Sequence, residues 1–338
     1  MKKRIKWVDC LRFFAIFSIY LYHFGDVTGK ACSFINLYHI KLFFFISGFF
    51  FTAVINTEEL SKRLIKTVYR VALPTCLFIV INVVFFSIIN SFSIEQTLSL
   101  LKTYSAMKKG SGIGGIWFVG CFFFTSVLHV LASYFIKNKY VVFLLSVSAY
   151  FYITLMTPYT FTGHLFASID LIPQYWVYYS LGSIVFPLLK RMDTSDRPRM
   201  SILRIGLFVL TGIYTAMSYS LGQNIDFDNN IIANSFESII LILFFTISAQ
   251  YIAKQLKYNS IIMKIGQATL VLCVTENMTK QIVTRVLAVV GVELQACSLI
   301  TAIILAAVYL LLGYMIWFKC IAGIFPVLSG HYSPKQVS

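Results

Sequence analysis

The sequence has few charges and lacks features typical of a soluble protein. Charged residues make up only 12% of the 338 residues, and just 13 side chains are acidic. A soluble domain needs more polar groups to cover its surface, so this composition excludes one. We find no internal repeat and no low-complexity segment.

The seven cysteines are scattered along the chain, and no metal-type or redox-type spacing links them. The glycine-rich stretch "KKGSGIGG" (108–115) lacks the lysine–hydroxyl ending of a phosphate-binding loop. The sequence therefore predicts no metal site and no permanently bound cofactor. Ordinary packing is the expected role of the cysteines, which are Cys10, Cys32, Cys76, Cys121, Cys273, Cys297 and Cys320.

Hydrophobic residues, in contrast, make up 58% of the chain. They form runs of about 17–25 residues, the length that crosses a bilayer as a helix. We therefore expect an all-α, polytopic membrane protein with about ten transmembrane helices. We expect one transmembrane domain over 1–325 and a short cytoplasmic tail over 326–338. The runs cover 7–24, 40–56, 68–90, 114–136, 140–157, 171–189, 205–221, 231–253, 262–278 and 296–318.

The net charge of +15 would suggest nucleic acid if the placement of the charges were ignored. With ten helices and a cytoplasmic N-terminus, 20 Lys and Arg fall inside and seven fall outside, among them Lys41. This asymmetry follows the positive-inside rule. Both termini are therefore predicted to be cytoplasmic, and no nucleic-acid partner is expected.

The first apolar run, "WVDCLRFFAIFSIYLYHFG" (7–25), keeps Asp9, Arg12 and His23. A charge near the bilayer centre costs about 2.5–3.5 kcal/mol on insertion scales. A simple interpretation is that Asp9 and Arg12, three residues apart, pair near the cytoplasmic edge and anchor the helix. Arg12 and His23, however, are eleven residues apart, close to three helical turns, so they share one face about 16 Å apart.

This alignment suits a long ligand that is anionic at its cytosolic end and reactive at its far end, as acyl-coenzyme A is. Arginine can bind phosphates through a bidentate fork. Histidine has a pKa near neutral and can accept a proton from a hydroxyl group. A lone histidine on an apolar helix is more often a packing residue, but its alignment with an intramembrane arginine favours function.

Four motifs in order resemble the acyltransferase 3 family of integral-membrane O-acyltransferases. They are the Asp–Arg–ten residues–His pattern of 9–23, "YHIKLFFFISGFFFT" (38–52), "KRLIKTVYRVALP" (62–74) and "GGIWFVG" (114–120). His39 occupies the place of a histidine in the sugar O-acetylase-like subgroup. The segment 265–277 departs from the family, which commonly ends there in Tyr and His, whereas this chain has Cys273 and Glu276.

The resemblance implies that acyl-CoA enters from the cytosol and that its acyl group reaches an acceptor on the outer side. It also implies that His23 is the catalytic base and that Arg12 helps to hold the donor, with Asp9 beside it. Direct transfer and an acyl-histidine intermediate both stay open.

Further candidates lie along the chain. Arg63, Lys66 and Arg70 follow a 3–4 spacing, so one helical face can meet the donor's phosphates, although charges that only set the topology explain them equally well. Pro74 is predicted to kink or start the third helix. Trp117 is a candidate for lining the donor cavity, and interfacial anchoring is the alternative.

Three residues are candidates for binding the acceptor. His39 begins the second helix, where it can approach His23 across the hairpin; two histidines and Asp26 are too few for a metal site. Glu237 and Glu276 are predicted intramembrane carboxylates. Because a carboxylate inside a membrane is costly, we interpret both as functional candidates.

We therefore expect an O-acyltransferase of the bacterial inner membrane. It would move an acyl group, with acetyl from acetyl-CoA as the expected donor group, to a hydroxyl of a cell-surface or lipid-linked glycan. The alternative is a transporter or flippase for a small anion or lipid-linked sugar, which also needs buried charges. Neither the acceptor sugar nor the oligomeric state follows from the sequence.

Overall fold

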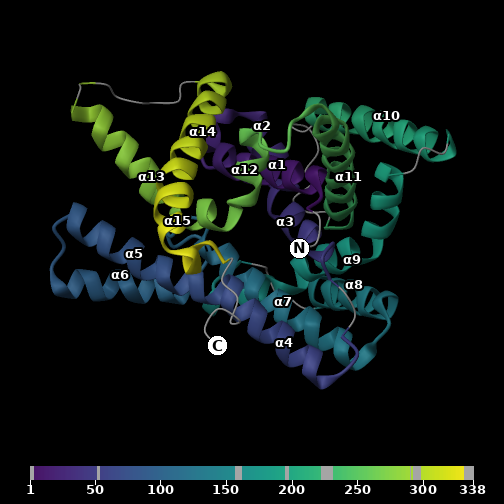
Figure 1. The fold of residues 1–338 in the computed structure, drawn as a ribbon, viewed down its shortest axis with the longest axis horizontal. Helices are drawn as coiled ribbons and strands as arrows, with labels where there is room; N and C mark the ends of the chain where they lie inside the picture. The colour runs from purple at the N-terminus through teal and green to yellow at the C-terminus, as the bar shows by residue number, and fades with distance from the viewer. Residues whose placement is uncertain are drawn as a thin grey trace. The chain divides into compact units, whose positions relative to one another are not determined.

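A computed structural model describes residues 4–51, 54–156, 162–194, 198–221, 231–289, 291 and 298–330. Every regular element in these residues is helical, as the sequence predicts (Figure 1). The elements, with η marking 3-10 or π turns, are α1 (Lys6–Tyr22), η1 (Gly25–Thr28), α2 (Lys30–Asn36), α3 (His39–Gly48), α4 (Thr57–Thr67), η2 (Val68–Ala72), α5 (Leu73–Ile89), α6 (Ile94–Ala106), α7 (Ile116–Ile136), α8 (Lys139–Met156), η3 (Phe166–Leu171), α9 (Ile172–Thr194), α10 (Pro198–Leu221), α11 (Ile231–Gln255), α12 (Ile261–Gln267), α13 (Thr269–Val289), α14 (Leu299–Gly313), η5 (Tyr314–Ile321), α15 (Ala322–Ile324) and η6 (Pro326–Ser329).

Six helices are long and apolar enough to cross a membrane, which makes the chain a multi-pass membrane protein. The predicted number of about ten is not confirmed. α1 is not among the six, because its 17 residues rise only about 26 Å, less than the hydrocarbon core. The six are Lys30–Gly48, Thr57–Ile89, Ile116–Ile136, Pro198–Ser220, Ala233–Gln255 and Leu299–Ile324.

The chain forms two compact units. Unit 1 comprises Met1–Phe51, Leu181–Gln267 and Ala296–Ala307. Within it, α1 contacts α2, α3, α11 and α12, so it has neighbours on several sides. Eleven of its 17 residues are buried, as expected for a helix enclosed by others rather than one lying on a surface.

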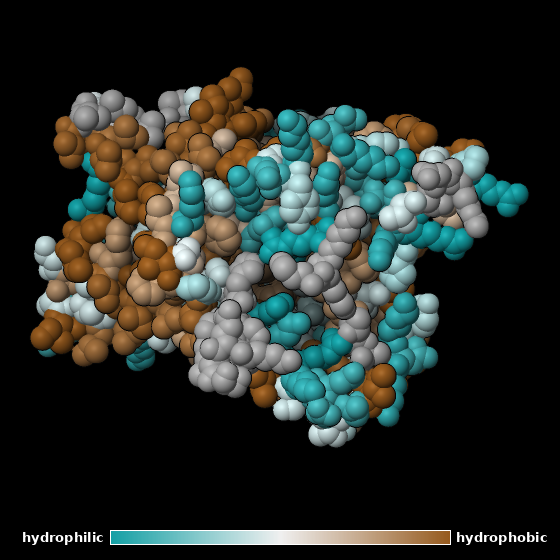
Figure 2. Space-filling model, viewed as in Figure 1, coloured by the Kyte–Doolittle hydropathy of each residue, from teal (hydrophilic) through white to brown (hydrophobic). Residues whose placement is uncertain are grey.

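Unit 2 comprises Thr52–Ser180, Ala268–Gln295 and Val308–Ser338. In it, α5 and α6 lie side by side as a hairpin (Figure 1). The exposed residues of α5 are apolar and recur every three or four positions, which is typical of a lipid-facing stripe; they include Leu77, Val80, Val84 and Ile88. Figure 2 shows hydrophobic surface over this helix.

Two predicted spans differ from the observed helices. The run 262–278 is not one helix, because α12 ends at Gln267 and α13 begins at Thr269. The run 40–56 is helical only to Gly48. Hydropathy detects apolar segments but not the breaks within them, so both predicted boundaries were wrong.

Pro74 lies in the first turn of α5, directly after the π turn η2. Proline has no N–H to donate to the carbonyl four residues earlier, here that of Arg70. The N–H of Leu73 bonds to the Val68 carbonyl five residues back, which makes a wider π turn. The proline predicted to kink or start a helix therefore lies at a change of helix type.

Candidate functional site

The first turns of α1 hold the predicted charge pair. A guanidinium nitrogen of Arg12 donates to Oδ1 of Asp9 at 3.4 Å, as the three-residue spacing predicts. The other carboxylate oxygen, Oδ2, accepts a hydrogen bond from the Gln267 side chain at 3.0 Å. The Arg12 guanidinium also lies 5.2 Å from the centroid of the Phe50 ring, within cation–π range. Asp9 is buried, whereas the Arg12 side chain keeps 31% of its surface exposed.

The backbone of α12 lies close enough to α1 for the Gln267 side chain to reach Asp9. A Cβ placed on Gly266 would lie 1.9 Å from the Asp9 carbonyl oxygen, which no real side chain tolerates. Glycine at 266 is therefore required for this contact. Gln267 was not predicted as a site residue, because it lies 258 positions from Asp9 and no local sequence pattern links the two.

His23 lies at the other end of α1 as its C-terminal cap, with φ −73° and ψ 1°. Its N–H still donates to the Ile19 carbonyl, so the helical register between Arg12 and His23 extends to this residue. The His23 side chain is exposed, and its ring centroid lies 5.9 Å from that of Tyr22. Arg12 thus lies in the second turn of α1, and His23 at its C-terminal end.

His39 approaches this end of α1 through an aromatic contact. Its ring stacks on Tyr22 with centroids 4.7 Å apart and an angle of 27°. Nδ1 of His39 lies 2.7 Å from the Ile35 carbonyl oxygen. Because a carbonyl only accepts, Nδ1 carries the proton and Nε2 carries the lone pair in neutral His39. The structure therefore brings the two histidines to one cluster, with the Tyr22 ring contacting both.

Glu237 is 1% exposed, and its Oε1 accepts a hydrogen bond from the Ser218 hydroxyl. Its Oε2 is buried and has no hydrogen-bond partner among the residues described here. Next to it on α11, Ser238 bonds to Lys41, a buried lysine of α3. Lys41 was predicted as an outer charge from the topology alone, and its burial was not predicted.

The predicted donor-binding cations lie in unit 2. Arg63 on α4 is half-buried, while Lys66 and Arg70 are exposed. The predicted face assumes a continuous α-helix, but the π turn begins at Val68, between Lys66 and Arg70. This wider turn rotates Arg70 away from the direction that a 3–4 spacing gives it.

Trp117, also in unit 2, is nearly buried in the first turn of α7. The Lys109 ammonium lies 5.5 Å from its ring centroid. Partial loss of hydration lowers the pKa of Lys109 from its ordinary value, and the Asp170 carboxylate opposes this shift. Trp117 therefore has a cationic neighbour that the sequence analysis did not pair with it.

Glu276, the third acceptor candidate, is fully buried on α13 of unit 2, and the Lys280 ammonium bonds to its Oε1 at 2.5 Å. A buried histidine that the sequence analysis missed, His129, accepts a hydrogen bond at Nδ1 from the Trp176 indole at 3.2 Å. Among the described residues, no group of three or more His, Cys, Asp and Glu side chains comes together in a way that would hold a metal ion.

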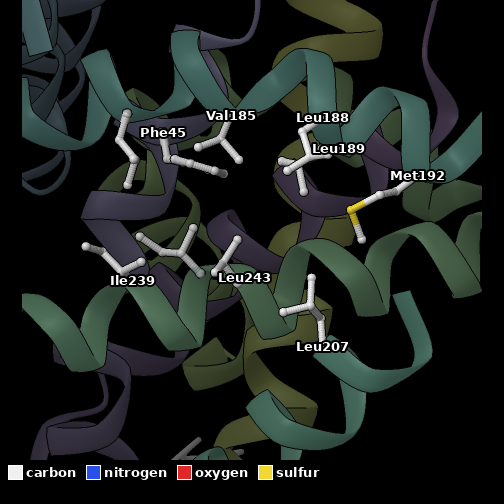
Figure 3. A pocket seen from close by; sticks show the side chains of 10 residues that line it. Phe45, Val185, Leu188, Leu189, Met192, Leu207, Ile239 and Leu243 are labelled. Atoms are coloured by element: carbon white, nitrogen blue, oxygen red, sulfur yellow. The ribbon is translucent and has the colours of Figure 1, made fainter. Parts of the chain in front are cut away.

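An apolar pocket of about 150 Å³ lies within unit 1, between α3, α9, α10 and α11 (Figure 3). None of the candidate site residues lines it. Its walls are hydrocarbon and one thioether, which suit an alkyl chain rather than a sugar or a phosphate. They are formed by Phe45, Leu181, Val185, Leu188, Leu189, Met192, Leu207, Ile239, Ile242 and Leu243.

Comparison with protein families gives a match over residues 5–318 to the acyltransferase 3 model, described as "Acyltransferase domain". Searches among curated proteins and among solved structures gave no match. The family match covers nearly the whole chain, including α1 and both units. It supports a membrane acyltransferase, which needs an acyl donor, an acyl acceptor and a bilayer. The chain, a multi-pass membrane protein whose described elements are all helical and whose first helix pairs a buried carboxylate with a partly exposed guanidinium, therefore belongs to the acyltransferase 3 family.

Proposed function

We propose that the protein is an O-acyltransferase of a bacterial inner membrane. It transfers an acetyl group from cytosolic acetyl-CoA to a hydroxyl of a cell-surface or lipid-linked glycan. The observation that carries the proposal is the arrangement of α1. An anchored guanidinium lies near its start, and a histidine in helical register lies at its end.

Arg12 supports the donor-binding half of the proposal. Asp9 neutralises part of its charge, yet the guanidinium keeps nearly a third of its side-chain surface exposed. It therefore retains donors for phosphate oxygens, and Asp9 and Gln267 fix its position. From the sequence pattern, Arg63 and Lys66 are proposed to bind phosphates of the donor, and Trp117 to contact the donor.

His23 supports the catalytic half. Its imidazole accepts the proton of the acceptor hydroxyl while the hydroxyl oxygen attacks the thioester carbonyl carbon. The tetrahedral intermediate collapses, the carbon–sulfur bond breaks, and the departing thiolate takes the proton from the imidazolium. The products are the O-acetyl ester and coenzyme A. His39, Glu237 and Glu276 are proposed to bind the acceptor.

The test uses membrane vesicles from cells producing the full-length protein, supplied with acetyl-CoA labelled in its acetyl group. We expect His23→Ala to lower the formation of base-labile acetyl ester in the glycan and lipid fractions by about 10²–10⁴-fold. The matched control is His164→Ala, which removes an exposed histidine of unit 2 and should leave transfer unchanged. Wild-type transfer by His23→Ala at equal protein level would overturn the role of His23.

A further inference from the structure

Lys41 is an ammonium group buried inside an apolar helix. It is only 7% exposed, and α3 around it reads "HIKLFFFISG". A lysine in a membrane-spanning segment is costly unless its donors are satisfied, and such residues usually mark functional places. Methionine would fill the same space if Lys41 served packing alone. The hydrogen-bond partners of the Lys41 ammonium therefore indicate its role.

Two of these partners lie four residues apart on α11. The ammonium donates to Oδ1 of Asn234 at 2.9 Å and to the hydroxyl of Ser238 at 2.7 Å. Four residues make about one turn, so both acceptors belong to the same face of α11. These bonds span 193 and 197 positions of sequence and join α3 to α11.

Ser238 extends the same contact to the corner between α2 and α3. Its hydroxyl oxygen lies 2.7 Å from the carbonyl oxygen of Leu37, the C-terminal cap of α2. One side of α11 therefore contacts both the end of α2 and the first turn of α3, although the single Ser238 proton is shared between the Leu37 carbonyl and the Asn234 carbonyl of its own helix. We call Lys41, Asn234 and Ser238 the α3–α11 clamp.

The corner held by this clamp carries His39. The His39 ring is oriented by its bond to the Ile35 carbonyl in α2 and by stacking on Tyr22 of α1. The first contact depends on the angle between α2 and α3, and the second on the position of α3 against α1. Tyr38 reinforces the corner through its hydroxyl, 3.0 Å from that of Ser18, and through stacking on Phe245.

We propose that Lys41 is a positioning residue for acyl transfer: the α3–α11 clamp holds His39 and Tyr22 in place beside His23. The inference rests on the proposed function, because it assigns Lys41 to the histidine end of that site. Lys41 acts through the α2–α3 corner and does not touch the reacting atoms.

The experiment measures acetyl transfer by the full-length protein in vesicles as a function of acetyl-CoA concentration. Lys41→Met keeps the length and apolar stem but removes the ammonium donors. We expect kcat to fall by about 10- to 100-fold, because small displacements of catalytic groups have effects of this size. The KM for acetyl-CoA should stay within about twofold, since Arg12 is bound by Asp9, which Gln267 holds in turn, and not by the clamp.

Lys30→Met is the matched control, because Lys30 is an exposed lysine of the same unit. It should leave both parameters unchanged. If Lys41→Met does not fold, Ser238→Ala removes one clamp bond with a smaller change and should also lower kcat without changing KM. Where both fold, the double variant should be no slower than the slower single variant, because the residues act as one unit.

Wild-type kcat in both single variants, or a rise in KM with no change in kcat, would overturn the role of Lys41. The two proposals fail separately. If the wild type forms no acetyl ester, the proposed function fails, and if His23→Ala transfers acetyl normally, the role of His23 fails. If His23→Ala is inactive and Lys41→Met is normal, only the clamp inference fails.

Discussion

In unit 1, Asp9 and Lys41 are bound by side chains about 200 positions or more away, namely Gln267, Asn234 and Ser238. In unit 2, by contrast, buried long-range bonds such as Asn82 to the Val274 carbonyl and Trp317 to Thr279 join neutral groups. Neutral polar groups hold membrane helices together at lower cost than charges do. The long-range bonds of Asp9 and Lys41 therefore make the charges inside unit 1 the ones that we expect to serve function.

The ion pairs of unit 2 differ in range as well. Glu58–Lys62 and Glu276–Lys280 both lie four residues apart on one helix. Such pairs support the helix that carries them but hold no second element. In unit 1, the pair Asp9–Arg12 is equally local, yet Gln267 ties it to α12. This tie is the feature that the following substitutions test.

The largest expected effect is that of Gly266→Val. A side chain at 266 would collide with the Asp9 carbonyl, so α12 must move away and Gln267 leaves the carboxylate. We expect a loss of stability of about 3 kcal/mol, the upper end of the usual range for overpacking. It would be measured as a lower thermal midpoint and less monodisperse protein in detergent.

Gly206→Ala is the matched control for this substitution. Gly206 belongs to α10 of the same unit, and a Cβ there meets no atom within 4 Å. Alanine favours a helix over glycine by about 1 kcal/mol, so this variant should be as stable as the wild type or slightly more so. A normal thermal midpoint for Gly266→Val would contradict the close approach of α12 to α1.

A smaller effect is expected when the ion pair Asp9–Arg12 of unit 1 is broken, and it is compared with the loss of the pair Glu58–Lys62 of unit 2. Asp9→Ala leaves the Gln267 amide and the Arg12 guanidinium without their shared acceptor, at a cost of about 1–3 kcal/mol. It should also raise the KM for acetyl-CoA, because Arg12 is no longer held. Thermal unfolding in detergent and the transfer assay measure the two effects.

Glu58→Ala breaks the exposed pair with Lys62 and should not shift the thermal midpoint measurably, since water replaces the partner. Equal shifts for Asp9→Ala and Glu58→Ala would show that Gln267 adds nothing to the α1 pair. The contrast between the two units would then be lost.

The local features of the site were predictable from the sequence, and the tertiary ones were not. A 3.6-residue period is enough to place Arg12 and His23 on one face of α1, and three-residue spacing is enough to pair Asp9 with Arg12. Gln267 and Lys41 were missed because their bonds depend on how distant helices pack. The break at Ala268 was missed because the overall apolar character of 262–278 predicts one continuous run, although Gly266, Gln267 and Thr269 lie beside the break.

The family assignment was also within reach of the sequence, since its motifs are local and occur in order along 9–120. The match over 5–318 confirms the family, whereas the sugar O-acetylase-like subgroup stays a prediction. The number of spans was harder to predict, because hydropathy marks α1 and α8 as apolar but does not give their length. Both are shorter or less apolar than the six long helices.

The smallest expected effects concern the cations of unit 2, where the structure and the sequence pattern disagree. If Arg63 and Lys66 meet the donor's phosphates, Arg63→Gln and Lys66→Gln should each raise the KM for acetyl-CoA by about three- to tenfold. Arg70→Gln should raise it less than about twofold if the π turn at Val68 turns Arg70 away from the phosphates.

The assay is repeated at high salt, which screens exposed charges and should reduce the differences between these variants and the wild type. A KM effect of Arg70→Gln equal to that of Arg63→Gln would restore the continuous face that the 3–4 spacing predicts. If none of the three substitutions changes the KM, these charges serve only to set the orientation of the helices in the membrane. Donor recognition would then rest on Arg12 and unit 1, which would make the contrast between the units sharper still.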